Sequence, residues 1–373
     1  MSRLEPAPCA TCQPVLRTGS DQLVLFTEGD ELYEAMLASI AGARKTVCLE
    51  TYIFAADEVG WRFAEALAER AGRGVQVRLH LDAVGCLFRW SRPLEEHLRM
   101  HGVRLRWFHR WRWRSPLRYN RRNHRKLLVV DDDEAYVGGF NIHRENSRAL
   151  VGDERWRDTH VHMRGGLARR GHEVFDTTWR GDHGCPAPAR QRAVSTLVPN
   201  HSSACRRALR CLLDAAFSDA RGTLYVTTPY FAPDRRTQRA LTAAARRGAD
   251  VRVLVPHRSD VRMARWAAPA AYADLLRHGV RVHAYLPRVL HAKTAVIDGN
   301  WGTVGTANFD YRSFFLNQEL NLVSRDRDLC RRLQEQFYED LSHARALSPE
   351  GMTAKPLARQ ASALAAWMAR RWL

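Results

Sequence analysis

The sequence predicts an α/β protein of two tandem, similarly built α-β-α domains, related by a pseudo-twofold axis and sharing one active site. Two observations carry this prediction. A constellation of polar residues occurs twice, at 124–141 and at 291–308, and strand–helix–strand spacing precedes each copy. Repetition of a whole supersecondary unit together with its polar residues indicates a duplicated domain, and binding sites favour domain junctions. A chain of 373 residues is long enough for two domains with separate cores.

The first half begins with a helix over 30–43, where apolar residues recur on one helical face. The stretches 45–54 and 75–82 are rich in β-branched and apolar residues, as expected of buried strands. Between them, 60–74 has helical periodicity and ends at a glycine. This order favours parallel strands with a covering helix.

The second half repeats the pattern. Helix, strand, helix and strand are expected in turn over 205–220, 222–233, 235–249 and 250–256. The match extends to short loops, because YIFAAD in the first half corresponds to YFAPD in the second. The duplication therefore extends well beyond the polar residues.

Domain boundaries are expected where Pro, Gly and His gather, at 181–203. The predicted order is a loose Pro-containing leader, a first domain, a second domain and a basic amphipathic tail, at 1–20, 21–190, 191–345 and 346–373. The tail places apolar residues from Leu357 to Trp372 on one helical face. Docking on the membrane interface and docking on the protein's own core remain equally open for it.

Each copy of the polar constellation is predicted to form a β-hairpin. Its first strand follows a His-x-Lys pair, an Asp stands near the turn, and a glycine-rich return strand ends in Asn. His and Lys two residues apart share one face of a strand, and the hairpin returns the Asn to their side. The residues are His124, Lys126, Asp131 and Asn141 in the first copy, and His291, Lys293, Asp298 and Asn308 in the second.

Two such patches facing each other suit a phosphodiester. Lysine and asparagine side chains can hold the non-bridging oxygens as phosphorus becomes five-coordinate. A neutral histidine can attack phosphorus and a protonated one can give a proton to the leaving alkoxide, which is accessible because imidazole titrates at about 6.5. The lysines already supply positive charge, so no metal or other cofactor is expected.

These motifs resemble the paired HKD motifs of the phospholipase D superfamily. The text around them, GTANFDYRSFFLNQE at 305–319 and WRDTH at 156–160, resembles bacterial cardiolipin synthases, in particular the short type without N-terminal transmembrane helices. The resemblance runs from about Leu23 to about Leu341. One departure is visible: the first copy has Gly-Gly-x-Asn and the second Gly-Thr-x-Asn, where the family commonly has Gly-Ser-x-Asn. Any role of that hydroxyl in the first copy is thereby left open.

The resemblance implies a phosphatidyltransferase that moves a phosphatidyl group from phosphatidylglycerol to the glycerol headgroup of a second lipid. By family analogy His124 is the nucleophile and His291 the proton donor and acceptor, although the near-symmetric copies do not themselves decide this. Asp131 and Asp298 are expected to support the motifs by pairing with neighbouring basic groups. Asp158 and Glu319 are expected to hydrogen-bond the far nitrogen of the histidine in their own half, with a surface salt bridge as the alternative.

Two other functions remain open. Water in place of the alcohol would make the protein a phospholipase D or, on nucleic acid, a nuclease. A non-catalytic binder of anionic surfaces would be expected to have degenerate motifs, whereas here each motif His, Lys and Asp is present.

Composition points to polyanionic partners. Lys and Arg number 58 against 40 Asp and Glu, a formal net charge of +18. With no apolar run of about twenty residues and no signal-peptide pattern, the expected location is peripheral, on the cytoplasmic face of the bacterial inner membrane, with anionic phospholipids as substrates and nucleic acid disfavoured. Oligomeric state is left open. The eight scattered cysteines are expected to be reduced thiols, and Cys9-x-x-Cys12 lacks partners for a zinc site.

The stretch 107–122 interleaves tryptophans with arginines just before the first motif. Three interpretations compete: a membrane-interface loop, a platform for single-stranded nucleic acid, and a structural extension in which arginine packs over tryptophan.

Overall fold

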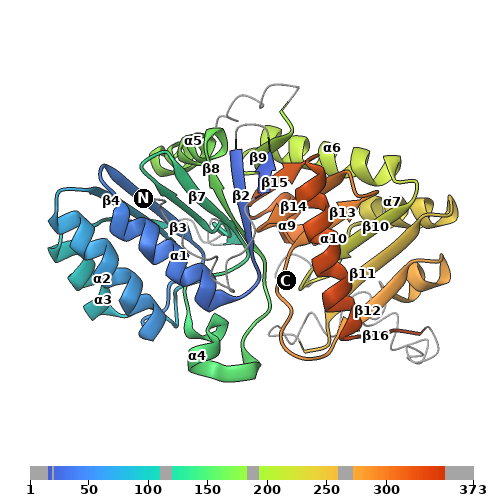
Figure 1. Cartoon of the computed structure of the whole chain (residues 1–373), viewed down its shortest axis with the longest axis horizontal. Helices are drawn as coiled ribbons and strands as arrows, with labels where there is room; N and C mark the ends of the chain where they lie inside the picture. Colours follow the sequence, from blue (N-terminus) through green and yellow to red (C-terminus); the bar gives the residue numbers. More distant parts are fainter. Residues whose placement is uncertain (1–15, 19–20, 110–119, 183–192, 259–271, 349–373) are drawn as a thin grey trace, which may run out of the picture.

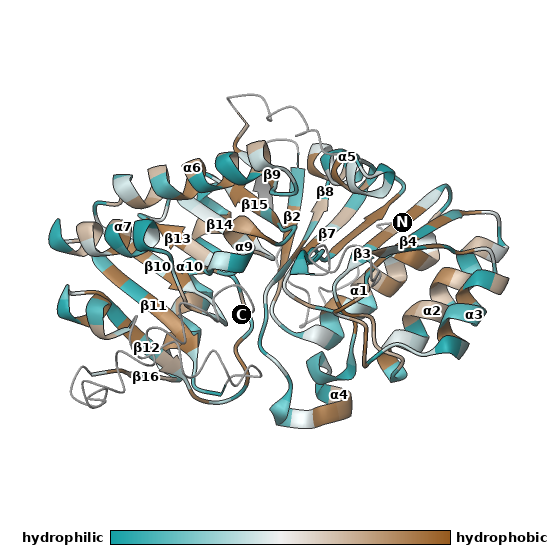
Figure 2. Ribbon diagram, turned by 180° about the vertical axis from the view of Figure 1, so that it is seen from behind, coloured by the Kyte–Doolittle hydropathy of each residue, from teal (hydrophilic) through white to brown (hydrophobic). Residues whose placement is uncertain are grey.

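The computed structural model describes residues 16–18, 21–109, 120–182, 193–258 and 272–348. Two eight-stranded sheets lie side by side and helices cover both faces of each (Figure 1). Figure 2 shows hydrophobic residues concentrated on the strands, while the outer helices are largely hydrophilic on the side facing solvent. The predicted α/β class with two similar halves is confirmed.

The first sheet has the order β1-β2-β8-β7-β6-β3-β4-β5. Its strands are β1 (Leu16–Thr18), β2 (Asp21–Phe26), β3 (Thr46–Thr51), β4 (Gln76–Asp82), β5 (Arg104–Phe108), β6 (Leu127–Val130), β7 (Glu134–Gly138) and β8 (His160–Arg164). Strands β3, β4 and β5 are parallel, whereas β6, β7 and β8 form an antiparallel meander next to β3.

The second sheet has the order β16-β12-β11-β10-β13-β14-β15-β9. Its strands are β9 (Ser195–Pro199), β10 (Thr223–Thr227), β11 (Asp250–Pro256), β12 (Arg281–Tyr285), β13 (Thr294–Ile297), β14 (Trp301–Gly305), β15 (Leu320–Ser324) and β16 (Ala344–Ala346). Seven strands follow the same order in both sheets, β2-β8-β7-β6-β3-β4-β5 matching β9-β15-β14-β13-β10-β11-β12. This shared order is the structural form of the duplication.

The helices divide between the two faces of each sheet. Helices α1 (Gly29–Gly42), α2 (Glu58–Gly72) and α3 (Arg92–Met100) cover one face of the first sheet, and α6 (Ser203–Asp219) and α7 (Arg235–Arg246) cover one face of the second. On the other faces, α5 (Gly166–Arg180) packs on the first sheet and α10 (Arg327–Ser342) on the second, and both contribute to one hydrophobic cluster that draws residues from both sheets. The halves therefore share a core, which fixes the position of one relative to the other.

The elements predicted from periodicity are confirmed as α1, β3, α2 and β4 in the first half and α6, β10, α7 and β11 in the second. The corresponding loops cap equivalent helices: Asp57 accepts a hydrogen bond from the Gly60 amide at the start of α2, and Asp234 from the Thr237 amide at the start of α7. Both predicted hairpins form, as β6–β7 and β13–β14.

Three expectations change at the edges. β1 lies within the stretch predicted to be a loose leader and pairs with β2. β16 crosses the predicted end of the second domain at 345. Cys205 is disulfide-bonded, so the expectation of reduced thiols is wrong at that position, while Cys48, Cys86, Cys211 and Cys330 are free.

Several predictions lie outside the described residues: the Cys9-x-x-Cys12 pair, most of the linker between the domains, residues 110–119 and the amphipathic tail. Within the described part of 107–122, Trp107 packs against the core of the first domain and meets the Trp90 ring edge-on at 5.2 Å. Among the helices of the described ranges, none combines the length and apolarity that crossing a bilayer requires.

Candidate active site

The two motif histidines lie where segments of the two halves cross. His124 stands three residues before β6, and its backbone N–H donates to the Gln318 carbonyl at 2.9 Å. His291 stands three residues before β13, and its N–H donates to the Arg157 carbonyl at 2.7 Å. Parallel bridges pair Asn123 with Gln318 and Arg157 with Leu290. Each histidine segment is therefore held by a segment of the opposite domain.

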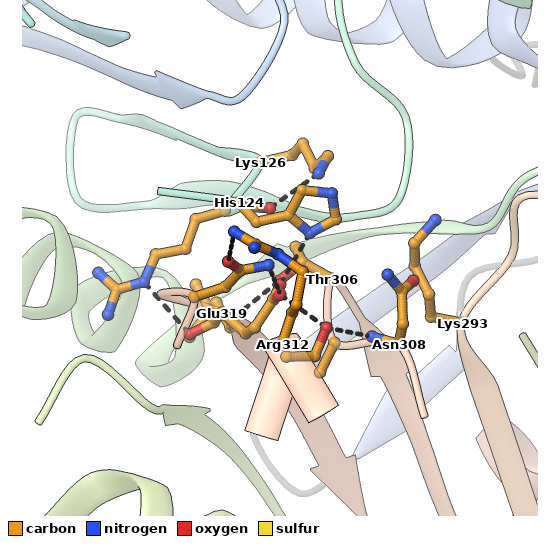
Figure 3. Close-up of polar contacts among 12 residues, drawn as sticks. His124, Lys126, Lys293, Thr306, Asn308, Arg312 and Glu319 are labelled. Carbon is orange, nitrogen blue, oxygen red and sulfur yellow. Dashed lines mark hydrogen bonds and ion pairs between the residues drawn. The ribbon is translucent and has the colours of Figure 1, made fainter. Parts of the chain in front are cut away.

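The carboxylates of Glu319 and Asp158 also contact the histidine of the opposite domain. His124 Nδ1 lies 3.0 Å from Glu319 Oε2, and His291 Nδ1 lies 2.5 Å from Asp158 Oδ2 (Figure 3 shows the first pair). The expectation that each acid serves the histidine of its own half is wrong, because the acids are crossed between domains. The physical reason is position: each acid follows the residues that bridge to the other half, so its side chain enters the junction from the far side.

Both pairs are buried, and both acids are ionised at neutral pH. Burial opposes ionisation, yet Lys293 and His291 hold the pKa of Asp158 down to about 2. Burial likewise opposes ionisation of Glu319, and His124 and Lys126 keep its pKa below the usual value. An ionised carboxylate accepts a hydrogen bond from Nδ1–H, which leaves Nε2 of each imidazole for substrate.

His124 is biased toward the neutral form. Burial lowers its pKa, Glu319 opposes that shift, and Lys126 adds to it, with a net pKa below the ordinary value. With Nδ1 directed at Glu319, a neutral ring carries its lone pair on Nε2. This is the protonation state that a nucleophilic imidazole requires.

The two motif lysines form a buried cationic pair. Lys126 and Lys293 are 2% and 1% exposed, so little water screens them. Lys126 Nζ donates to the His124 carbonyl at 2.8 Å, and Lys293 Nζ lies 3.5 Å from Asp158 Oδ2. Burial first, and then the charge of Lys293, lower the pKa of Lys126 to about 7. Two buried ammonium groups that repel each other favour an anion between them.

The motif asparagines occupy equivalent places just beyond β7 and β14. Asn141 Oδ1 accepts from the Ile53 amide at 3.2 Å, and Asn308 Nδ2 donates to Asp310 Oδ2 at 3.2 Å. Asn308 is buried and lies beside Lys293 in the close-up view (Figure 3). The second hairpin thus returns its amide to the side of the motif lysine (Figure 3). A phosphate-binding role for the two asparagines stays a prediction.

The motif aspartates lie away from the histidines, at the turns of the two hairpins. Asp131 accepts hydrogen bonds from the backbone amides of residues 44, 45 and 46 at 2.7–2.8 Å, and Asp298 accepts from those of 221, 222 and 223 at 2.7–2.9 Å. They stand at the hairpin turns, with left-handed φ of +51° and +50°. At about 3.3 Å per residue, roughly 20 Å of chain separates each from its histidine. Their partners are backbone amides rather than the basic side chains predicted, and this position does not support contact with a phosphate.

The glycine difference between the copies has a steric cause. A Cβ at Gly139 would lie 2.0 Å from Asp158 Oδ1, so that carboxylate occupies the space of the missing side chain. In the second copy Thr306 Oγ1 donates to Glu319 Oε2 at 2.6 Å. In the first copy the Thr159 amide donates to Asp158 Oδ1 at 2.7 Å instead. The two halves therefore supply the further donors of their acids differently, and Glu319 Oε1 also accepts from Ser313 Oγ at 2.9 Å.

Sequence reasoning missed four contributors to the junction. Aromatic rings flank the histidines, with Tyr52 4.9 Å from His124 and Trp156 5.2 Å from His291 between ring centroids. The buried Arg312 donates to Asn120 Oδ1 at 2.9 Å across the domain boundary. Correspondence of the YIFAAD and YFAPD loops was the signal that pointed to Tyr52. The other three lie in the segments 156–160 and 305–319 that carry the family resemblance, but no role was predicted for them.

The fourth is His160, the first residue of β8. Its ring is buried, and neither ring nitrogen has a hydrogen-bond partner among the described residues. Burial lowers its pKa to about 3, so the ring is neutral. It packs against Gly138, where a Cβ would lie 2.6 Å from its Nδ1, and the equivalent position in β15 is Asn321. His160 thus fills the space behind the first motif.

Within the described ranges no group of three or more His, Cys, Asp or Glu side chains is placed to hold a metal ion. The positive charge at the junction comes from side chains of the chain itself.

Comparison with known proteins agrees with this geometry. A family model described as cardiolipin synthase, PLD-like domain, matches residues 36–151 and 213–341, one stretch around each motif. The structure of phosphatidylserine synthase from Haemophilus influenzae Rd KW20 superposes with a TM-score of 0.70, covers 96% of both chains and is 13% identical. Polyphosphate kinase from Porphyromonas gingivalis gives a TM-score of 0.62 at 14% identity, over 94% of this chain and 53% of that one. Fold and site define a protein of two phospholipase D-like domains.

Curated relatives narrow the class. The probable cardiolipin synthase YwiE of Bacillus subtilis strain 168 is 30% identical over 88% of this chain and 67% of its own length. The cardiolipin synthase of Geobacillus kaustophilus strain HTA426 is 32% identical over 90% of this chain and 69% of its own. The chain belongs to the cardiolipin synthase family of the phospholipase D superfamily, a family of phosphatidyltransferases, which confirms the resemblance and the enzyme class expected from the motifs.

Proposed function

We propose that the protein synthesises cardiolipin by moving a phosphatidyl group from one phosphatidylglycerol to the glycerol headgroup of another. The observation that carries this proposal is the pair of crossed histidine–carboxylate couples around two buried lysines. Two imidazoles, each with Nδ1 engaged by an ionised acid, present two Nε2 atoms to one phosphate from opposite domains. This arrangement supports a two-step displacement with a covalent intermediate.

In the first step Nε2 of neutral His124 attacks phosphorus, and the phosphorus–oxygen bond to the glycerol headgroup breaks. His291, protonated on Nε2 and held by Asp158, gives that proton to the departing alkoxide, so glycerol leaves neutral. The phosphatidyl–imidazole carries positive charge, which ionised Glu319 stabilises through Nδ1–H. Assignment of His124 as nucleophile is supported by its lowered pKa.

In the second step His291, now neutral, takes the proton from a glycerol hydroxyl of the acceptor lipid. The resulting oxygen nucleophile attacks phosphorus, the phosphorus–nitrogen bond breaks, and His124 returns to its neutral form. Lys126 and Lys293 hold the non-bridging oxygens in both steps, with Asn141 and Asn308 completing the cradle. Asp131 and Asp298 act by anchoring the hairpins that carry these groups.

The substrates place the enzyme at a bilayer. A net charge of +18 favours contact with anionic phospholipid headgroups. We assign it a peripheral position on the cytoplasmic face of the bacterial inner membrane. The same charge also attracts nucleic acid, which is the alternative substrate. Cleavage of an oligonucleotide in place of cardiolipin formation would identify it.

The proposal is tested by replacing His124 with Ala and, separately, His291 with Ala, and by measuring cardiolipin formed from labelled phosphatidylglycerol in mixed micelles. Both variants should lose activity by at least about a thousandfold. Half-buried His278, whose ring contacts Asp274 away from both motifs, is the matched control, and His278→Ala should retain activity. An alkaline quench of wild type should trap phosphatidyl on residue 124. Full activity in either motif variant would remove the two-histidine scheme, and phosphatidic acid as the main product would reassign the protein as a hydrolase.

A further inference from the structure

A second polar cavity, of about 370 Å³, lies behind the first motif. It opens between β5, the end of α5, the start of α6 and the segment that precedes β15. None of the motif histidines, lysines or asparagines lines it. Its described walls carry four arginines and three histidines against a single acid, Asp182. So strong a bias of charge indicates an anionic ligand.

The cavity is separate from the phosphate site because it lies on the opposite face of the crossing segments. Residues 123 and 318 pair in a parallel bridge, and side chains alternate faces along such segments. His124 and Glu319 turn toward the active site and contact each other. Gln318 lies one residue before Glu319 and Arg121 lies three residues before His124, so both point to the other face, where they line the cavity.

One arginine of the cavity, Arg206, is held in an unfavourable state by burial and by a second arginine. Burial, and then the charge of Arg121, lower the pKa of half-buried Arg206. The Arg206 guanidinium donates a long hydrogen bond, of 3.4 Å, to the Asn200 carbonyl. Among the described residues neither Arg121 nor Arg206 forms a salt bridge with an acid. An anion between the two would replace their repulsion by two charge-assisted interactions.

The remaining wall is aromatic. Arg106 stacks on Trp179, with its guanidinium carbon 4.6 Å from the ring centroid, and donates to the Trp179 carbonyl at 2.5 Å. Phe108 lies on the same side. Beside a cationic pair, such a wall suits a phosphate that carries an organic group rather than a bare ion.

We propose that this cavity is a second anion site, which binds a phosphate ester between Arg121 and Arg206 with its organic part against Trp179. The site also has a route to the active centre. His201, in its wall, contacts buried Arg125 at 3.0 Å, and Arg125 Nε donates to the Glu319 carbonyl at 3.2 Å. A ligand in the cavity would therefore affect the position of Glu319, which holds His124.

The test uses the full chain, with isothermal titration of glycerol 1-phosphate as the soluble probe and flotation with vesicles of phosphatidylcholine, with and without phosphatidylglycerol, as the lipid probe. Arg206→Gln removes one member of the pair, and Arg121→Gln removes the other from a different element. Arg207→Gln is the matched control, because it removes the same charge from the next, exposed position of α6. Thermal unfolding confirms that each variant is folded.

The proposal expects both cavity variants to weaken binding about tenfold or more relative to the control, while single-turnover chemistry at saturating substrate persists. Loss confined to glycerol 1-phosphate identifies a soluble phosphate ester as the ligand, and loss that extends to phosphatidylglycerol vesicles identifies a lipid headgroup. If both cavity variants bind both probes as the control does, or if Arg207→Gln weakens binding equally, the cavity is not an anion site.

Discussion

The crossed pairing of acids and histidines makes a prediction that distinguishes it from pairing within each half. Glu319→Gln keeps the shape of the side chain but removes its charge, and Asp158→Asn does the same in the other domain. If His124 is the nucleophile and His291 the proton donor, then loss of Glu319 should weaken the nucleophilic step, and loss of Asp158 should weaken proton donation. Variants of each acid should therefore behave like variants of the histidine that it contacts.

The magnitude follows from the geometry. Glu319 is fully buried, and its oxygen lies 3.0 Å from His124 Nδ1, so the charge centres are about 4 Å apart. At an effective dielectric constant of about 20, such a pair is worth roughly 4 kcal/mol to the cationic phosphatidyl–imidazole. Since about 1.4 kcal/mol changes a rate tenfold, Glu319→Gln should slow formation of the intermediate by about a thousandfold.

The assay compares two donors in single turnovers: phosphatidylglycerol, whose glycerol leaving group needs a proton, and phosphatidyl-p-nitrophenol, whose leaving group departs without one. Release of p-nitrophenolate is followed by absorbance. The activated donor should restore His291→Ala and Asp158→Asn to near the wild-type rate and leave His124→Ala and Glu319→Gln slow.

Glu134→Gln is the matched control, because Glu134 also contacts a histidine, His162, at 3.2 Å but at the far end of β7. This variant should react with each of the two donors at a rate within about twofold of wild type. The reasoning is refuted if Glu319→Gln is rescued together with His291→Ala, since that result would pair Glu319 with the histidine of its own half.

Three further outcomes are expected. Lys126→Met should abolish activity yet raise the free energy of unfolding by about 1–3 kcal/mol in urea melts near pH 7. The pKa of Lys126 is about 7 in the folded protein and about 10.4 in the unfolded chain. Wild type, unlike the variant, should therefore gain stability as pH rises from about 7 to 10. Gly139→Ala should inactivate the enzyme because its methyl overlaps the carboxylate that holds His291, whereas Gly72→Ala, with open space around it, should not change turnover. Arg157→Met, which leaves a buried carboxylate of α10 unpaired across the domain boundary, should lower the free energy of unfolding by about 3–5 kcal/mol, and a loss below 1 kcal/mol would show that this ion pair does not tie the halves together.

Much of the fold was predictable because it depends on local patterns. Apolar runs such as LLVV and TAVI became β6 and β13, each the first strand of a predicted hairpin. The duplication was visible because equivalent loops keep the same capping aspartate, Asp57 or Asp234. In each case the residues that determine the structure are within a few positions of one another.

What could not be predicted depends on contacts between distant segments. The partner of Asp158 is 133 positions away and the partner of Glu319 is 195 positions away, and no spacing within one half reveals a crossing. The partners of the motif aspartates, Asp131 and Asp298, were mispredicted for a related reason: these amides lie at the starts of β3 and β10, some 75 to 87 positions earlier. Burial of His160 likewise follows from how β7 and β8 pair, not from its neighbours in sequence.

The crossing has a consequence for how a duplicated fold becomes one enzyme. If each acid contacted the histidine of its own domain, each domain would orient its histidine by itself. Docking would then only bring two preformed histidine–carboxylate pairs together. Here neither histidine has its carboxylate partner until the halves dock, because both carboxylates and both backbone acceptors come from the opposite domain. The hydrophobic cluster that draws residues from both sheets therefore does more than stabilise the fold: it makes domain docking and assembly of the catalytic pairs the same event.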